Sequence, residues 1–249
     1  MINENDLSAL LLKNTAIRVV EPDIYSVLPD NETGNEYDTQ FGYIYDWVAC
    51  NPIYNRFIWG YSVKIFSRIA NDALRSATQG NVLDIGCGSL AFTANTYDKY
   101  SERPVILVDQ SLKMLRIAKS RLIKRNGKIS DNLVFLHADA LRLPFQEKIF
   151  QTIISQNLLH CLNDTSILLK KLNNITSGEG GMYFTTLVKN HRLADKYLEA
   201  LADSGKLVSR TMDDHKSVFR QLGMPARYEI KGSMLSIHSE KSKNQRTGQ

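Results

Sequence analysis

The chain has 249 residues, of which 43% are hydrophobic and 23% charged, and its formal net charge is +5. Three cysteines without a CxxC pair argue against a disulfide framework and structural zinc, and the five histidines show no ligand spacing. No apolar run approaches the about 20 residues of a membrane span, and the N-terminus lacks the basic region of a secretory signal. We therefore expect a cytoplasmic protein with no metal site.

Residues 1–76 are predicted to form a helical N-terminal cap. A polar loop follows Pro29, and a helical stripe of apolar side chains runs from Val63 to Leu74. The segment between them is rich in aromatic side chains, which could wall an apolar or planar substrate or form a core beneath the cap. These aromatic residues include Tyr43, Tyr45, Trp47, Tyr54 and Trp59.

After Gly80 the pattern changes to alternating strands and amphipathic helices. Ser111 and Asp164 precede two of the helical segments and are natural N-caps. Alternation at this spacing predicts a parallel, doubly wound sheet. The predicted strands are 81–85, 104–108, 133–137, 150–155 and 182–188.

The last third of the chain departs from this alternation. Two helical segments, roughly 192–204 and 213–221, precede two strands, 226–231 and 234–239, which Gly232 and Ser233 connect. A two-residue connection of this kind predicts an antiparallel hairpin. The sequence thus predicts an α/β fold, a Rossmann-like sheet of seven strands that is mainly parallel, within residues 77–240. Residues 241–249 lack apolar side chains and are expected to form a disordered tail.

The segment VLDIGCGSLAF, residues 82–92, is a strand that runs into a glycine turn. Gly86 and Gly88, with a small residue at Ala91, satisfy the dinucleotide fingerprint, but that match is weak alone. Asp84 stands two places before the first glycine, where its charge would oppose a pyrophosphate. A cofactor with an ammonium and a sulfonium group reverses this preference, so Asp84 favours S-adenosylmethionine over a dinucleotide.

Residues 81–188 resemble a class I S-adenosylmethionine-dependent methyltransferase, because several motifs agree in order and spacing. VLDIGCGS, ILVDQS, HADALRLPF, FQTIISQNLLHCL and SGEGGMYFTTL each resemble one of the family's motifs. The resemblance is strongest to the small-molecule type, such as the ubiquinone/menaquinone C-methyltransferases. Two departures stand out: Leu90 replaces the third glycine, and Ser177 to Glu179 replace the usual proline turn. We expect Leu90 to pack the start of the following helix.

The resemblance implies a binding site for S-adenosylmethionine, with S-adenosylhomocysteine as its product. Asp84 would attract the methionine ammonium, Asp109 would bind both ribose hydroxyls, and Asp139 would face the adenine amine. The other implied contacts come from glycine-turn backbone, adenine-bordering residues and the end of the fourth strand. They are Gly86, Cys87, Gly88, Gln110, Met114, Ala140, Gln156 and Asn157.

His160 is the best candidate for a catalytic base, because it follows the fourth strand at the carboxyl edge of the sheet. The alternative interpretation is a histidine at a helix start that hydrogen-bonds a neighbour. Cys87 and Cys161 would also lie near the site, and we expect both to be packing residues rather than reactive thiols.

We expect methyl transfer to a small, apolar or aromatic molecule. One alternative is an RNA or protein methyltransferase that uses the basic helix around Lys113 to Arg125. The segment NPIY at Asn51 resembles the motif of nucleic-acid amine methyltransferases, but it precedes the glycine turn instead of following the fourth strand. Another alternative is a non-catalytic protein that binds S-adenosylmethionine as a partner or scaffold. The sequence leaves the oligomeric state open.

Overall fold

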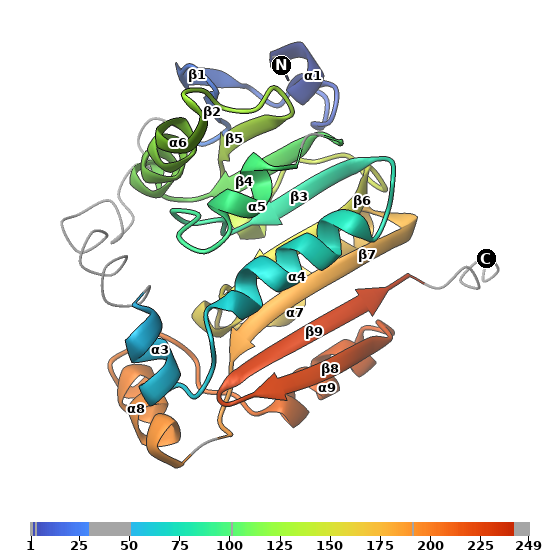
Figure 1. Ribbon diagram of the computed structural model, residues 1–249. Coiled ribbons are helices and arrows are strands. Elements are labelled where there is room, and N and C mark those ends of the chain that lie inside the picture. The colour runs from blue at the N-terminus through green and yellow to red at the C-terminus, as the bar shows by residue number, and fades with distance from the viewer. Residues whose placement is uncertain (1, 3, 30–50, 101, 191, 242–249) are drawn as a thin grey trace, which may run out of the picture.

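A computed structural model describes residues 2, 4–29, 51–100, 102–190 and 192–241 (Figure 1). In this part of the chain a nine-stranded sheet has the order β1-β2-β5-β4-β3-β6-β7-β9-β8. Its strands are β1 (Arg18–Glu21), β2 (Ile24–Ser26), β3 (Asn81–Ile85), β4 (Val105–Asp109), β5 (Leu133–His137), β6 (Phe150–Gln156), β7 (Thr176–Leu187), β8 (Ala226–Lys231) and β9 (Met234–Glu240).

The seven strands from β3 to β9 form the predicted doubly wound sheet. β3, β4, β5, β6 and β7 are parallel, whereas β9 pairs antiparallel with β7 and with β8. The chain builds the sheet outwards from β3 in both directions, so the strand order reverses there. In open sheets of this kind, ligands bind at the carboxyl ends of the strands beside that reversal. The predicted Rossmann-like fold and its terminal hairpin are confirmed.

The N-terminal region contributes two strands, β1 and β2, to the sheet. The sheet therefore has nine strands instead of the predicted seven, and the N-terminal region is not wholly helical. β2 pairs parallel with β5, with Tyr25 opposite Leu136, and β1 pairs antiparallel with β2. Both strands are short: β1 has no buried residue, and β2 has only three residues, of which Ile24 and Ser26 are buried, so neither shows a long alternation of apolar and polar residues. Pairing with a buried edge strand, rather than local sequence pattern, therefore stabilises them.

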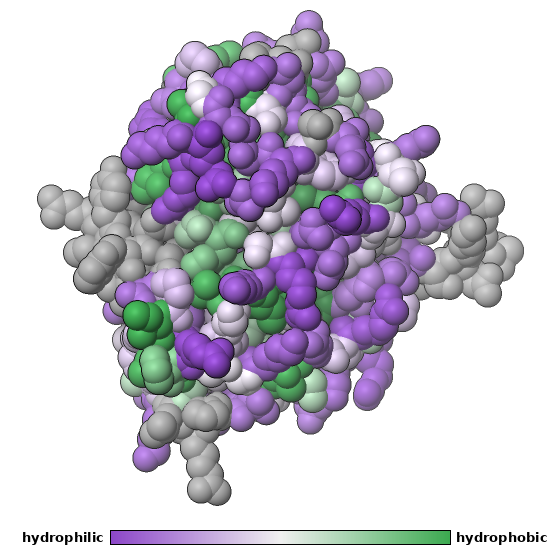
Figure 2. All heavy atoms as spheres, viewed as in Figure 1, coloured by the Kyte–Doolittle hydropathy of each residue, from purple (hydrophilic) through white to green (hydrophobic). Residues whose placement is uncertain are grey.

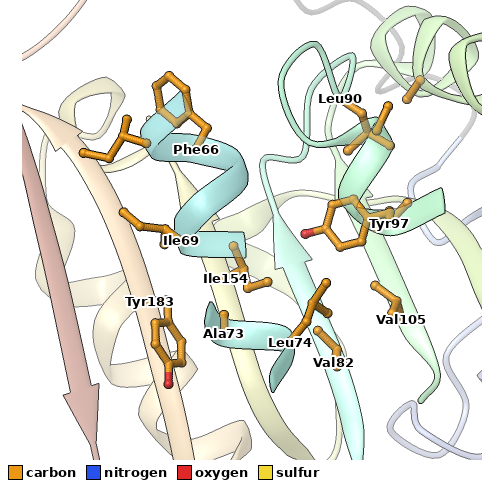
Figure 3. Packing of buried hydrophobic residues seen from close by; sticks show 14 of the residues in the cluster. Phe66, Ile69, Ala73, Leu74, Val82, Leu90, Tyr97, Val105, Ile154 and Tyr183 are labelled. Carbon is orange, nitrogen blue, oxygen red and sulfur yellow. The ribbon is translucent and has the colours of Figure 1, made fainter. Parts of the chain in front are cut away.

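Helices cover both faces of the sheet. α4 (Lys64–Arg75), α5 (Ala94–Asp98) and α6 (Leu112–Asn126) pack on one face, while α1 (Glu4–Ser8), α7 (Thr165–Ile175) and α9 (Met212–Gln221) pack on the other. Figure 1 shows α4 lying across β6 and β7. The predicted apolar stripe of α4 supplies Phe66, Ile69 and Leu74 to the core in Figure 3. Within the described residues, no helix is long and apolar enough to cross a membrane.

The described part of the aromatic segment packs against α8 (Arg192–Asp203). Trp59 and Tyr54 contact Tyr197, with ring centroids 5.4 and 6.4 Å apart respectively. Asn51 caps α3 (Pro52–Ile58) through its side chain, so NPIY is the start of a helix. Tyr43, Tyr45 and Trp47, and the predicted tail beyond residue 241, lie outside the described residues.

Both predicted N-caps are confirmed. The Ser111 side chain accepts a hydrogen bond from the backbone N–H of Met114 at the start of α6. Asp164 accepts the corresponding bond from Ser166 at the start of α7. These caps fix where the chain turns from a strand into a helix, and so where the loops at the carboxyl edge of the sheet lie.

Candidate active site

The glycine turn after β3 has alternating left-handed backbone conformations. Gly86 has a φ of +68° and Gly88 a φ of +56°. A Cβ on Gly86 would contact Leu158 at 3.4 Å, whereas no heavy atom would lie within 4 Å of a Cβ on Gly88. The backbone N–H groups of Gly86 and Cys87 both donate to the carbonyl of Val108. The turn is therefore fastened to β4 while its Gly88 end stays open to a ligand.

Leu90 adopts the conformation that a glycine would favour at this position. Its φ is +54°, and its side chain is 2% exposed within the core around α5. A left-handed conformation costs a non-glycine residue about 1 kcal/mol. α5 begins only at Ala94, after Thr93 at the N-cap position, so Leu90 packs the turn before the helix rather than the helix start itself.

A cavity of about 560 Å³ opens at the carboxyl ends of β3, β4, β5 and β6. Every cofactor-binding residue predicted from the sequence lines this cavity. These residues are Asp84, Gly86, Cys87, Gly88, Asp109, Gln110, Met114, Asp139, Ala140, Gln156 and Asn157. The structure thus brings together residues from four strand ends that are up to about seventy positions apart in the chain.

Asp109 ties the cavity's loops together. Its Oδ2 accepts a hydrogen bond from the N–H of Gly88 at 2.8 Å, and its Oδ1 accepts one from the N–H of Ser111 at 2.9 Å. Asp109 therefore joins the glycine turn to the start of α6 at the wall of the cavity.

Asp139 and Gln156 are also held by local hydrogen bonds. Oδ1 of Asp139 accepts from the N–H of Leu141 at 2.8 Å, and its Oδ2 forms an ion pair with Arg142 at 2.8 Å. Nε2 of Gln156 donates to the carbonyl of Phe66 on α4 at 2.9 Å. The orientation of both polar side chains is therefore set before any ligand binds.

Asp84 is buried and has only one of its oxygens paired. Oδ2 accepts a hydrogen bond from the hydroxyl of Tyr97 at 2.6 Å, whereas Oδ1 is buried without a partner in the structure. Burial raises the pKa of Asp84 to about 7; the Tyr97 hydrogen bond opposes this shift and the nearby charge of Asp109 adds to it. An unpaired carboxylate oxygen at the wall of a cavity is suited to a cationic group.

The other wall of the cavity is apolar. Phe66 from α4 stacks on Phe92, with ring centroids 5.1 Å apart and an interplanar angle of 11°. Leu158 and Leu162 complete this wall. Figure 2, in the same view as Figure 1, shows apolar surface near the N-terminal end of α4. The sequence did not assign these four residues to a site; the contact of Phe66 with Phe92 depends on how α4 packs on the sheet.

His160 is buried away from this cavity. It lies in the short 3-10 helix Leu159–Cys161 and is absent from the described residues that line the cavity. Its Nδ1 accepts a hydrogen bond from the N–H of Leu187 at 3.3 Å. Burial, followed by the charges of His215 and Arg210, lowers the pKa of His160 to about 4. The base role of His160 stays a prediction that this placement does not support.

The two described cysteines are free thiols at the cavity. Burial raises the pKa of Cys161 to about 11. Burial, together with the charges of Asp109 and Asp84, also raises the pKa of Cys87. Both groups are therefore protonated near neutral pH. Cys87 packs against the core as expected, whereas Cys161 is exposed and its predicted packing role is wrong.

The residues present fit a cationic nucleoside cofactor. Three carboxylates line the cavity, and among its described lining residues there is no lysine, arginine or histidine. Two buried acceptors, Oδ1 of Asp84 and Oδ1 of Asn157, have no protein partner. A dinucleotide pyrophosphate would meet only negative charge here, whereas an ammonium and a sulfonium would be attracted.

A Rossmann-like sheet with this arrangement of acids defines an S-adenosylmethionine-dependent methyltransferase. The chain belongs to the methyltransferase domain family Methyltransf_31, whose model matches residues 77–242. A ubiquinone/menaquinone biosynthesis C-methyltransferase, UbiE of Cellvibrio japonicus, is 28% identical over 180 residues, which are 69% of this chain and 71% of that protein. A malonyl-[acyl-carrier protein] O-methyltransferase of Legionella pneumophila is 26% identical over 43% of this chain and 36% of its own length.

Solved structures show the same fold at lower identity. A putative methyltransferase of Haloferax volcanii, in complex with the Trm112 activator, superposes with a TM-score of 0.63 at 14% identity, over 84% of this chain and 99% of that one. The geranyl diphosphate C-methyltransferase of Streptomyces coelicolor gives a TM-score of 0.58 at 12% identity, over 71% of this chain and 75% of that one. These neighbours support the fold of the enzyme and leave its acceptor to be argued from the site.

Proposed function

We propose that this enzyme transfers a methyl group from S-adenosylmethionine to a small, uncharged acceptor with an apolar or aromatic body. The observation that carries the proposal is the cavity itself, in which three carboxylates lie beside an apolar wall that includes the stacked rings of Phe66 and Phe92. The relationship to a ubiquinone/menaquinone C-methyltransferase agrees with an acceptor of this class.

The three carboxylates would hold the cofactor at separate points. Asp84 would attract the methionine ammonium, Asp109 would accept from the ribose hydroxyls, and Asp139 would accept from the adenine amine, beside a backbone donor at Ala140. Gln110 and Met114 would border the adenine, and Gln156 and Asn157 the methionine portion. Cys87, Gly86 and Gly88 would contribute backbone only. When bound, S-adenosylmethionine supplies an activated methyl group, so the protein's main work is to position the acceptor and exclude water.

The charge of the cavity lining favours a neutral acceptor. Three acidic residues line the cavity and no basic ones are found among its described residues, so an anionic acceptor would be repelled. On the basic face of α6, Arg116 and Lys119 pair with Glu21 and Arg125 pairs with Asp98, so part of its positive charge is already neutralised within the protein. Both features favour a neutral molecule over RNA or another polyanion.

The test is transfer of labelled methyl groups. The protein is incubated with methyl-labelled S-adenosylmethionine and, separately, with a small-molecule metabolite extract, with total RNA and with a protein extract. We expect label in neutral, organic-extractable products of the first incubation. Label in RNA or protein alone would contradict the proposed acceptor class, and no label in any incubation would contradict the proposed activity.

Matched variants make this test specific to the cavity. Asp109→Ala should lower transfer at least about a hundredfold, because it removes the proposed ribose contacts and the hydrogen bonds that fix Gly88 and Ser111. Asp131→Ala removes a carboxylate that is 59% exposed and lies outside the cavity, so it should leave transfer unchanged. Equal activity in the two variants would show that Asp109 does not hold the cofactor.

A further inference from the structure

Tyr97 is a buried tyrosine whose hydroxyl has a single acidic partner in the site. Its side chain is fully buried, and its hydroxyl donates to Oδ2 of Asp84 at 2.6 Å. Figure 3 places the ring beside Leu90 and Val105, with the hydroxyl directed towards β3. The α5 helix that carries Tyr97 packs against α6 and α4, so the ring has little freedom to move away from Asp84.

Because of this hydrogen bond, the two oxygens of Asp84 have different surroundings. Oδ2 is occupied by Tyr97, whereas Oδ1 is buried, lacks a protein partner and belongs to a residue that lines the cavity. Rotation of the carboxylate would break the short Tyr97 bond, so the orientation of Oδ1 is fixed before a ligand arrives. A fixed acceptor loses less entropy on binding than one that must first be ordered.

We propose that Tyr97 is a positioning residue that holds Asp84 so that its second oxygen receives the ammonium group of the cofactor. The inference rests on the proposed function, since it takes Asp84 as the ammonium partner. Tyr97 itself does not line the cavity and acts through Asp84 alone. Nothing in the local sequence pattern marks Tyr97 for this role.

The groups that face Asp84 make the positioning sensitive to pH. Tyr97 from α5 donates a hydrogen bond and favours the carboxylate, whereas Asp109 from β4 and the burial of the site favour the neutral acid. The Cys87 thiol from the glycine turn is protonated, since burial raises its pKa. The pKa of Asp84 is raised to about 7, so a cation that binds Oδ1 would displace a proton below that pH.

The experiment is calorimetric titration of wild type and Tyr97→Phe with S-adenosylhomocysteine between about pH 5.5 and pH 8. We expect wild-type affinity to rise with pH through the pKa of Asp84. Loss of the Tyr97 bond should shift the midpoint of this increase in affinity to a pH about one unit higher. At pH 7 the variant should therefore bind about fivefold more weakly. Binding should also release more protons in the variant than in wild type near pH 7.

Two controls separate positioning from a general structural effect. Tyr100→Phe makes the same change at a buried tyrosine whose hydroxyl bonds Arg103 and the Leu74 carbonyl, so it should keep the wild-type pH profile. 5′-Methylthioadenosine lacks the amino-acid portion of the cofactor, so its affinity should be the same for wild type and Tyr97→Phe. In an Asp84→Asn background, Tyr97→Phe should no longer shift the pH profile.

The outcomes are distinguishable. Failure of wild type to bind S-adenosylhomocysteine would defeat the proposed function itself. Wild-type binding with an unshifted pH profile in Tyr97→Phe would overturn only the role of Tyr97. An equal loss of affinity for 5′-methylthioadenosine would also overturn it, since a merely structural defect would then explain the variant.

Discussion

Leu90 shows how one residue can satisfy two opposing demands. Its backbone needs a left-handed conformation, with a φ of +54°, which a glycine adopts without strain. Its side chain is 2% exposed and packs in the core with Tyr97, which a glycine could not do. Burial of a leucine side chain contributes about 2 kcal/mol, more than the about 1 kcal/mol of backbone strain. The net balance therefore favours leucine at this turn.

A substitution series at Leu90 tests this balance. Leu90→Ala should lower the free energy of unfolding by about 2–5 kcal/mol, because it loses the packing and keeps the strain. Leu90→Gly should be about 1 kcal/mol more stable than Leu90→Ala, because glycine relieves the strain. Urea denaturation measures both. Leu107, a buried residue of β4, provides the control position. Because its backbone is extended, Leu107→Ala should be more stable than Leu107→Gly. If Leu90→Ala were likewise more stable than Leu90→Gly, the proposed backbone strain at Leu90 would be refuted.

At the scale of elements, the strand β2 is connected to the cavity through a buried histidine. His137 of β5 lies opposite Ser26 of β2, and its Nδ1 is 2.9 Å from the Ser26 hydroxyl. Its Nε2 is 3.0 Å from the carbonyl of Gln110, which can only accept, so Nε2 carries the proton and Nδ1 accepts from Ser26. The pair therefore links β2 to the loop after β4.

Ser26→Ala should reveal this link as a local loss of stability. The variant removes the donor that Ser26 provides to His137, and the free energy of unfolding should fall by about 1–3 kcal/mol. Amide hydrogen exchange should quicken where β2 pairs with β5, at Tyr25 and Leu136. Ser204→Ala removes an exposed hydroxyl from the end of α8 and should change stability by less than about 0.5 kcal/mol. Equal effects of the two changes would refute the link.

At the scale of the whole molecule, buried titratable groups of opposite sign shape the dependence of stability on pH. Burial, with the charge of Arg210, lowers the pKa of His215 to about 4, so its stabilising contribution is present above its ordinary value of 6.5 and is lost as the pH falls. The pKa of Asp84 is raised to about 7, so its contribution is present below 3.8 and is lost as the pH rises towards 7. Between about pH 4 and pH 7, therefore, His215 makes the free energy of unfolding rise with pH, whereas Asp84 makes it fall.

Two variants should therefore change the slope of stability against pH in opposite directions. Between about pH 5 and 6, His215→Leu should lower the slope of the free energy of unfolding by about 1.4 kcal/mol per pH unit, and Asp84→Asn should raise it by a similar amount. His215→Leu should be tolerated at pH 8, because neither ring nitrogen of His215 has a hydrogen-bond partner. Urea titrations at several pH values measure these slopes, and parallel curves for all three proteins would disprove the assignment.

Most of the cavity could be predicted from sequence because its polar residues come from local patterns. Asp84, Gly88 and Asp109 stand at fixed positions where a strand ends, and strand ends meet at one edge of a parallel sheet. Tyr97 and the apolar wall could not be predicted in this way, since their positions depend on how helices pack on the sheet. β1 and β2 were missed because three or four residues are too few to carry a clear periodic signal.

The most direct test of the three carboxylates is a crystal structure of the protein with S-adenosylhomocysteine. We expect the amino group at Oδ1 of Asp84, the ribose hydroxyls at Asp109 and the adenine amine at Asp139, with the Tyr97 bond to Asp84 intact. Density for the ligand outside the cavity, or with the amino group directed away from Asp84, would contradict these assignments.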